Sequence, residues 1–213
     1  MNEQPPPISY QPIATSQQLK AIVLCGGKST RMGSDKGLLL KDGKIWAQHI
    51  ADLFITLKIP FAVSCRVEQL EEYEKHFSRE IIVTDKFSDS DNTIHGPLNG
   101  ILSVHCAFPD KDLLIIACDM LQMSVTIIEN LISEYQTEIR NPKPEIFCFC
   151  LNENPFVEPL CAIYSGILLK KIVSDFYSDI KISGSLQNLI KTNCSFIIPT
   201  NDNFAFSNFN NPI

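Results

Sequence analysis

The chain has 213 residues, of which 45% are hydrophobic and 20% are charged, and its formal net charge is −6. A chain of this length and composition can bury one sizeable core, which predicts a single globular domain. The acidic balance excludes a general positive field for nucleic-acid binding, and the longest apolar runs fall well short of the about 20 residues that span a bilayer.

The first 18 residues differ in composition from the rest of the chain. They contain the run Pro5-Pro6-Pro7 and few large apolar side chains, so we expect residues 1–18 to form a flexible leader and residues 19–213 to form one domain. None of the eight cysteines forms a C-x-x-C pair, and several lie inside apolar runs. Reduced core thiols and the absence of a signal-like start indicate a cytoplasmic protein.

From residue 20 onward, short apolar runs alternate with segments of helical periodicity. This alternation is typical of β-α-β units and predicts an α/β fold with a largely parallel sheet. The predicted strands are 21–24, 61–64, 81–83, 113–117, 146–150 and 196–198. The predicted helices are 45–57, 67–76, 98–107, 125–135, 166–177 and 185–191.

The first predicted strand runs directly into a glycine-rich loop. Gly26 and Gly27 allow a tight turn, after which consecutive backbone N–H groups can converge on phosphate oxygens. Arg31 and Lys36 would neutralise the phosphate charge. The spacing fits neither G-x-x-x-x-G-K-[S/T] nor G-x-G-x-x-G, which disfavours a Walker ATPase and a classical dinucleotide site. A tight turn without a ligand is the alternative interpretation.

Two carboxylates follow predicted strands, at the sheet edge where open α/β folds bind ligands. Asp119 follows the strand 113–117 and could hold Mg²⁺ against a triphosphate. Its structural alternative is to cap the helix that begins near Ser124. Asp85 follows the strand 81–83, and its alternative is a solvated carboxylate in an acidic loop.

The loop sequence resembles that of the molybdenum cofactor guanylyltransferase family, which reads L-x-G-G-x-x-x-R-M-G followed closely by D-K-G. The matching positions are Leu24, Gly26, Gly27, Arg31, Met32, Gly33, Asp35, Lys36 and Gly37. The similarity continues in residues 96–100, in Cys118-Asp119, in Pro159 and the strand after it, and in residues 208–212. It therefore spans nearly the whole chain after residue 19.

This resemblance implies a doubly wound, Rossmann-like nucleotidyltransferase fold and the transfer of GMP from GTP to the phosphate of molybdopterin, with release of pyrophosphate. It implies Mg²⁺ as the cofactor, with Asp119 as the metal ligand and Lys36, Arg31 and Asp119 as catalytic residues. Molybdoenzymes and other cofactor-biosynthesis proteins are the implied protein partners. The implied nucleotide-binding residues are Leu24, Cys25, Gly26, Gly27, Lys36, Cys65, Asp85 and Asp119.

Three departures from the family pattern concern specificity. Cys65 stands where the family commonly has an asparagine that reads guanine, the segment between Asp85 and Gly96 is longer than usual, and Glu158 stands where many members have histidine. Cytidylyl transfer, nucleotidyl transfer to a sugar phosphate, and a non-catalytic binding module are therefore alternatives. We expect GTP to remain the preferred donor, with weaker discrimination that Cys65→Asn would sharpen.

Overall fold

The computed structural model describes residues 18–26, 35–87, 94, 96–138, 140, 142–151, 157–178, 180, 182, 184–202 and 204–206. The predictions made for Gly27, for Arg31 and for the leader up to residue 17 lie outside the described residues, as do those for residues 208–212.

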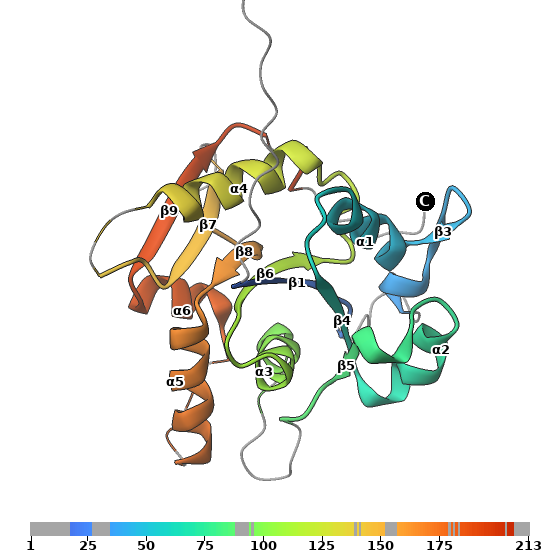
Figure 1. The fold of residues 1–213 in the computed structure, drawn as a ribbon, viewed down its shortest axis with the longest axis horizontal. Helices are drawn as coiled ribbons and strands as arrows, with labels where there is room; N and C mark the ends of the chain where they lie inside the picture. The colour runs from blue at the N-terminus through green and yellow to red at the C-terminus, as the bar shows by residue number, and fades with distance from the viewer. Residues whose placement is uncertain are drawn as a thin grey trace, which may run out of the picture.

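A seven-stranded sheet runs through the described part of the chain (Figure 1). Its spatial order is β5 (Ile82–Thr84), β4 (Phe61–Cys65), β1 (Leu19–Leu24), β6 (Asp112–Ala117), β8 (Val157–Tyr164), β7 (Ile146–Leu151) and β9 (Ser195–Thr200). The strands β5, β4, β1 and β6 are parallel, and β9 is parallel to β7, whereas β8 is antiparallel to both of its neighbours. The predicted α/β fold with a largely parallel sheet is confirmed.

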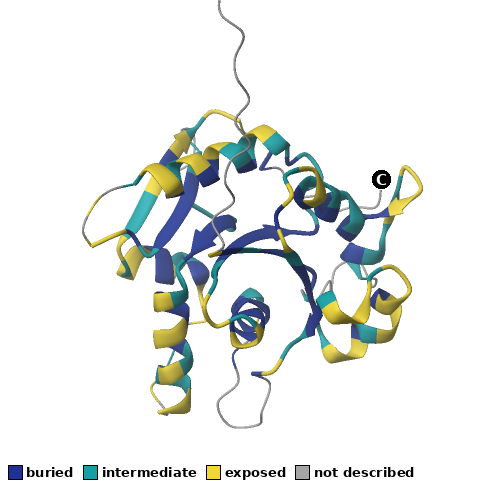
Figure 2. Ribbon diagram, viewed as in Figure 1, coloured by how far each residue is buried: buried dark blue, intermediate teal, exposed yellow. Residues whose placement is uncertain are grey.

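Helices cover both faces of this sheet. One hydrophobic cluster contains Ala21 and Val23 of β1 and buried side chains of α1 (Trp46–Thr56), α2 (Leu70–Glu74) and α4 (Val125–Thr137). The other contains Ile22 and Leu24 and side chains of α3 (Pro97–Ala107), α5 (Gly166–Tyr177) and α6 (Leu186–Thr192). Figure 2 shows the central strands buried between these layers. Burial on both faces explains why the parallel strands are continuous apolar runs in the sequence.

Most predicted elements match the observed ones to within two residues. The predicted helix 67–76 is shorter and divides into η2 (Val67–Gln69) and α2, and η3 (Arg79–Ile81) precedes β5. The periodicity does not predict β8, because its apolar run is interrupted by Glu158 and Pro159. Nor does it predict the hairpin of β2 (Leu40–Lys41) and β3 (Lys44–Ile45), whose strands are too short to show a period.

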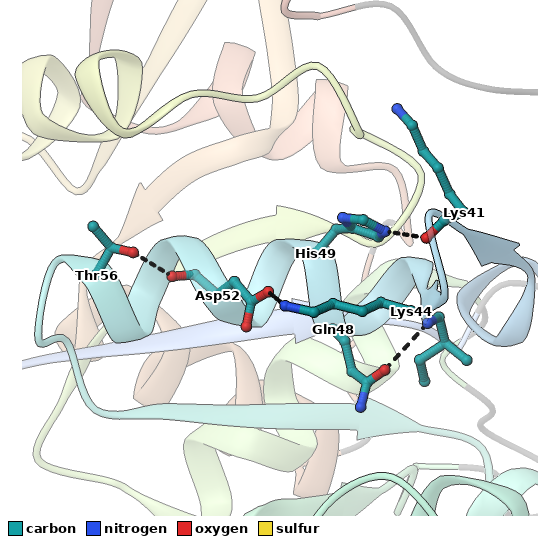
Figure 3. Close-up of polar contacts among 7 residues, drawn as sticks. Lys41, Lys44, Gln48, His49, Asp52 and Thr56 are labelled. Atoms are coloured by element: carbon teal, nitrogen blue, oxygen red, sulfur yellow. Dashed lines mark hydrogen bonds and ion pairs between the residues drawn. The ribbon is translucent and has the colours of Figure 1, made fainter.

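The hairpin is attached to the first turns of α1 (Figure 3). The backbone N–H of Ile45 donates to Gln48 Oε1 at 3.1 Å, and His49 Nε2 donates to the carbonyl oxygen of Lys41 at 2.8 Å. Lys44 Nζ lies 2.6 Å from Asp52 Oδ2 on the next turn. These contacts fix the chain that follows η1 (Lys36–Leu38). They therefore help to fix the position of the Lys36 backbone.

Candidate active site

A cavity of about 180 Å³ lies at the carboxyl ends of β1 and β6. Asp85, which follows β5, and the first residues of α3 complete its wall, and Lys36 reaches it from η1. This is the edge at which open α/β sheets bind ligands. The lining residues are Leu24, Cys25, Gly26, Lys36, Asp85, Gly96, Pro97, Gly100, Ala117, Cys118, Asp119 and Leu160.

Lys36 and Asp119, which are 83 positions apart in the sequence, meet in this cavity. Lys36 Nζ lies 2.8 Å from Asp119 Oδ2, and the two side chains are only 20% and 17% exposed. Asp119 follows β6 in a turn in which the N–H of Met120 donates to the carbonyl of Ala117. Ser124 caps α4 with its own side chain, so the capping alternative for Asp119 is wrong. A cationic and an anionic group thus face the same small, partly desolvated space.

The turn after β1 is held from both sides by neighbouring strands. The N–H of Cys25 donates to the carbonyl of Ser64 on β4, and the N–H of Cys118 donates to the carbonyl of Leu24. Gly26 follows directly and lines the cavity. A Cβ atom on Gly26 would lie 3.6 Å from Asp85 Oδ2, so the absence of a side chain leaves this carboxylate open to the cavity.

Asp85 is a carboxylate with unusual surroundings. Burial raises its pKa to about 6. The positive charge of Arg66 lowers the pKa, and the negative charge of Glu68 raises it. Its Oδ1 is buried and has no hydrogen-bond partner among the residues that the structure describes. A buried acceptor without a donor is costly for the protein.

Helix α3 positions Asp85 through the residues that follow it. Asn99 Oδ1 accepts the N–H of Phe87 at 3.1 Å, and Ser103 Oγ accepts the N–H of Lys86 at 2.9 Å. A Cβ atom on Gly100 would lie 2.5 Å from Ser64 Oγ, so only glycine allows this close approach of α3 to β4. Gly96, at the start of the helix, has φ of 72°. These contacts explain why glycine stands at positions 96 and 100 and asparagine at position 99.

Cys65 and Glu158 are the two departures from the family pattern that the structure describes, and the side chain of Cys65 does not lie where a nucleotide-binding residue was expected. The side chain of Cys65 is fully buried in the hydrophobic core and does not line the cavity, whereas Cys25 and Cys118 do. Burial raises the pKa of the Glu158 carboxyl, and the charge of Asp119 raises it further. Glu158 Oε1 accepts the N–H of Leu160 at 2.8 Å. The structure therefore brings together Leu24, Cys25, Gly26, Lys36, Asp85 and Asp119, but not the side chain of Cys65.

A lysine and an acidic residue face one cavity, beside a glycine turn at the carboxyl edge of a doubly wound sheet. This is the arrangement expected of a site for a phosphorylated nucleotide. Residues 21–191 match the MobA-like NTP transferase domain, and the chain belongs to that family of nucleotidyltransferases.

Relatives of known name agree with this assignment. A probable molybdenum cofactor guanylyltransferase of Flavobacterium johnsoniae is 32% identical over 165 residues, which cover 76% of this chain and 77% of that protein. A molybdenum cofactor biosynthesis bifunctional protein of Synechocystis sp. is 28% identical over 194 residues; the match covers 91% of this chain but only 52% of that longer protein.

Solved structures agree on the fold. The molybdopterin-guanine dinucleotide biosynthesis protein A of Archaeoglobus fulgidus superimposes with a TM-score of 0.68 at 19% identity, over 91% of this chain and 93% of that one. Among the helices of the described residues, none has the length and apolar character needed to cross a bilayer.

Proposed function

We propose that the protein transfers GMP from GTP to the terminal phosphate of molybdopterin and releases pyrophosphate. An oxygen of the acceptor phosphate attacks the α-phosphorus of GTP, and the bond to the β,γ-diphosphate breaks with its electron pair leaving on pyrophosphate. Such a reaction requires positioning and charge neutralisation more than a protein nucleophile. The observation that carries the proposal is the meeting of Lys36 and Asp119 in the cavity beside Gly26.

Their positions support roles for Lys36 and the glycine loop in binding the nucleotide donor, GTP. Lys36 would contact the triphosphate and stabilise negative charge as it develops on the oxygens around the α-phosphorus. The backbone of residues 24–26 would support the same phosphates through its N–H groups. Arg31 is proposed to contribute a second positive charge to phosphate binding, and Gly27 a further backbone N–H group.

The metal proposed for this reaction is Mg²⁺, held by Asp119. Among the described residues, no group of three or more His, Cys, Asp or Glu side chains is arranged to hold a metal ion. A single carboxylate beside a triphosphate pocket nevertheless fits Mg²⁺, which proteins bind through one or two carboxylates together with substrate phosphates and water. The ion would neutralise part of the triphosphate charge when bound.

Asp85 supports guanine as the base. An ionised carboxylate only accepts hydrogen bonds, and the edge of guanine presents two adjacent donors, N1–H and the N2 amino group. Cytosine presents one amino donor next to an acceptor nitrogen, which a carboxylate would repel. With a pKa of about 6, Asp85 is mainly ionised at neutral pH. This side chain, rather than Cys65, is therefore proposed to select GTP over CTP.

The test is a panel of GTP, CTP, UTP and ATP at equal concentration with Mg²⁺ and molybdopterin. Dinucleotide is separated by chromatography and pyrophosphate is measured by a coupled assay. We expect molybdopterin guanine dinucleotide and pyrophosphate in equal amounts with GTP. More product with CTP than with GTP would refute the guanylyl assignment, and nucleotide binding without any product would favour a binding module.

A further inference from the structure

The aspartate that precedes Lys36 accepts three partly buried hydrogen bonds, two of them from a distant segment of the chain. Asp35 Oδ2 accepts Nε2 of Gln69 at 2.6 Å, and Asp35 Oδ1 accepts the hydroxyl of Tyr73 at 3.2 Å. Asp35 Oδ1 also accepts the N–H of Gly37 at 3.0 Å and so caps the short helix η1. The Asp35 carboxylate therefore holds the backbone both before Lys36, at Asp35 itself, and after it, at Gly37.

These partners are themselves buried. Gln69 is 6% exposed and Tyr73 is fully buried in the hydrophobic core. A Cβ atom on Gly37 would collide with the hydroxyl oxygen of Tyr73, so the backbone of η1 lies directly against this ring. Burial raises the pKa of the Asp35 carboxyl, while its three hydrogen bonds and the charge of Arg66 act in the opposite direction. A desolvated carboxylate without these donors would not hold this position.

Gln69 also connects the segment that follows β4 to the segment that precedes Lys36. Its Oε1 accepts the N–H of Arg66 at 2.7 Å, directly after β4, while its Nε2 binds Asp35. Arg66 borders Gly26, because its Cγ lies 3.8 Å from the place of a Cβ atom there, and its charge lowers the pKa of Asp85. One side-chain amide thus joins the segment beside Asp85 to the segment that carries Lys36.

We infer that Gln69 and Tyr73 are positioning residues that act on the transferase reaction through Asp35 and set the direction in which Lys36 enters the cavity. This inference rests on the proposed function, because Lys36 has no reaction to support without it. Neither residue lines the cavity itself, although the Tyr73 hydroxyl also contacts the thiol of Cys25, which does. Their effect should therefore depend on the presence of the Lys36 amine.

A double-mutant cycle tests this dependence. Gln69→Glu keeps the acceptor for Arg66 but replaces the amide donor with a carboxylate facing Asp35, and Tyr73→Phe removes only the hydroxyl. Each is measured alone and combined with Lys36→Ala, by kcat, by KM for GTP and by the dissociation constant of Mg·GTP. The matched control is Tyr135→Phe, because the Tyr135 hydroxyl donates to Asp112 Oδ2 at 2.5 Å at the opposite end of β6.

We expect Gln69→Glu to lower kcat by about 10-fold, a fraction of the 10²–10³-fold that an oriented transition-state donor is worth, with KM for GTP changed less. Tyr73→Phe should lower kcat less, and Tyr135→Phe should leave it unchanged. In the Lys36→Ala background, Gln69→Glu and Tyr73→Phe should cause no further loss in kcat or in affinity for Mg·GTP. If Gln69→Glu does not fold by circular dichroism, Tyr73→Phe carries the cycle.

The inference would be overturned if Gln69→Glu and Tyr73→Phe lowered kcat equally with Lys36 present and absent. It would also be overturned if both variants had the kcat of the unmodified protein. The proposed function would stand in either case. Failure of the proposed function looks different, since the unmodified protein then makes no dinucleotide. The cycle is in that case decided by the dissociation constants of Mg·GTP alone, or of the nucleotide that binds most tightly. Substitution effects on affinity that persist unchanged without Lys36 would again contradict the inference.

Discussion

Replacing Asp85 with asparagine is expected to stabilise the protein at neutral and alkaline pH while weakening GTP binding. Burial raises the pKa of this carboxyl from the ordinary 3.8 to about 6. A displacement of about two pH units corresponds to ~3 kcal/mol at ~1.4 kcal/mol per unit. The side chain is only partly buried, and solvent screening reduces the expected gain to about 1–2 kcal/mol.

The sign follows from proton linkage. Because the pKa is higher in the folded state, protonation of Asp85 favours folding, so this contribution is complete below pH 3.8 and is lost as the pH rises through about 6. Asparagine imitates the neutral carboxyl at every pH. The unfolding free energies of wild type and Asp85→Asn should therefore agree near pH 4 and differ by about 1–2 kcal/mol at pH 8.

Urea unfolding from pH 4 to pH 8 measures this difference. Asp52→Asn is the control, because Asp52 forms an exposed ion pair with Lys44 and should change stability by less than about 1 kcal/mol at all pH values. The same Asp85→Asn protein should bind GTP about 10-fold or more weakly at pH 8, since hydrogen bonds to a charged group are worth ~1.5–3 kcal/mol. A stability difference that is independent of pH would refute this reasoning.

Three further substitutions have defined outcomes. Lys36→Ala should lower kcat by about 10²–10³-fold with an unchanged circular dichroism spectrum, and an active, normally saturating variant would remove Lys36 from the mechanism. Asp119→Asn should raise the Mg²⁺ concentration needed for half-maximal rate, because the amide lacks the charge that holds a hard cation; unchanged metal dependence would return Asp119 to a structural role. Cys65→Asn should destabilise the fold by about 1–3 kcal/mol in urea unfolding by burying an unpaired amide, without sharpening base choice. A stable variant with a higher GTP-to-CTP ratio would show that residue 65 reads the base after all.

The sequence predicts those parts of the fold and site that depend on local pattern. Strands such as β1 are buried on both faces, so they appear as uninterrupted apolar runs, and Asp85 and Asp119 are recognisable because each follows such a run. Lys36 is recognisable from the glycine loop and the family motif. These signals depend on residues that are close together along the chain.

The parts that could not be predicted depend on contacts between distant segments. The hydrogen bonds from Gln69 and Tyr73 to Asp35 join positions 34 and 38 residues apart, and neither donor belongs to a recognisable motif. The direction of the Cys65 side chain depends on the alternation of β4 between two cores, and a slip of one residue reverses it. The apolar periodicity does not show β8, because Glu158 and Pro159 interrupt it, and only the family resemblance points to a strand after Pro159.

The placement of the nucleotide is the central claim, and a crystal structure with GTP and Mn²⁺ in place of Mg²⁺ tests it most directly. Anomalous scattering locates the metal independently of the nucleotide density. We expect the metal bound to Asp119, the phosphates at Lys36, and the N1 and N2 atoms of guanine within hydrogen-bonding distance of the Asp85 carboxylate. A base that lies away from Asp85, or a metal that is not bound by Asp119, would contradict the proposed site.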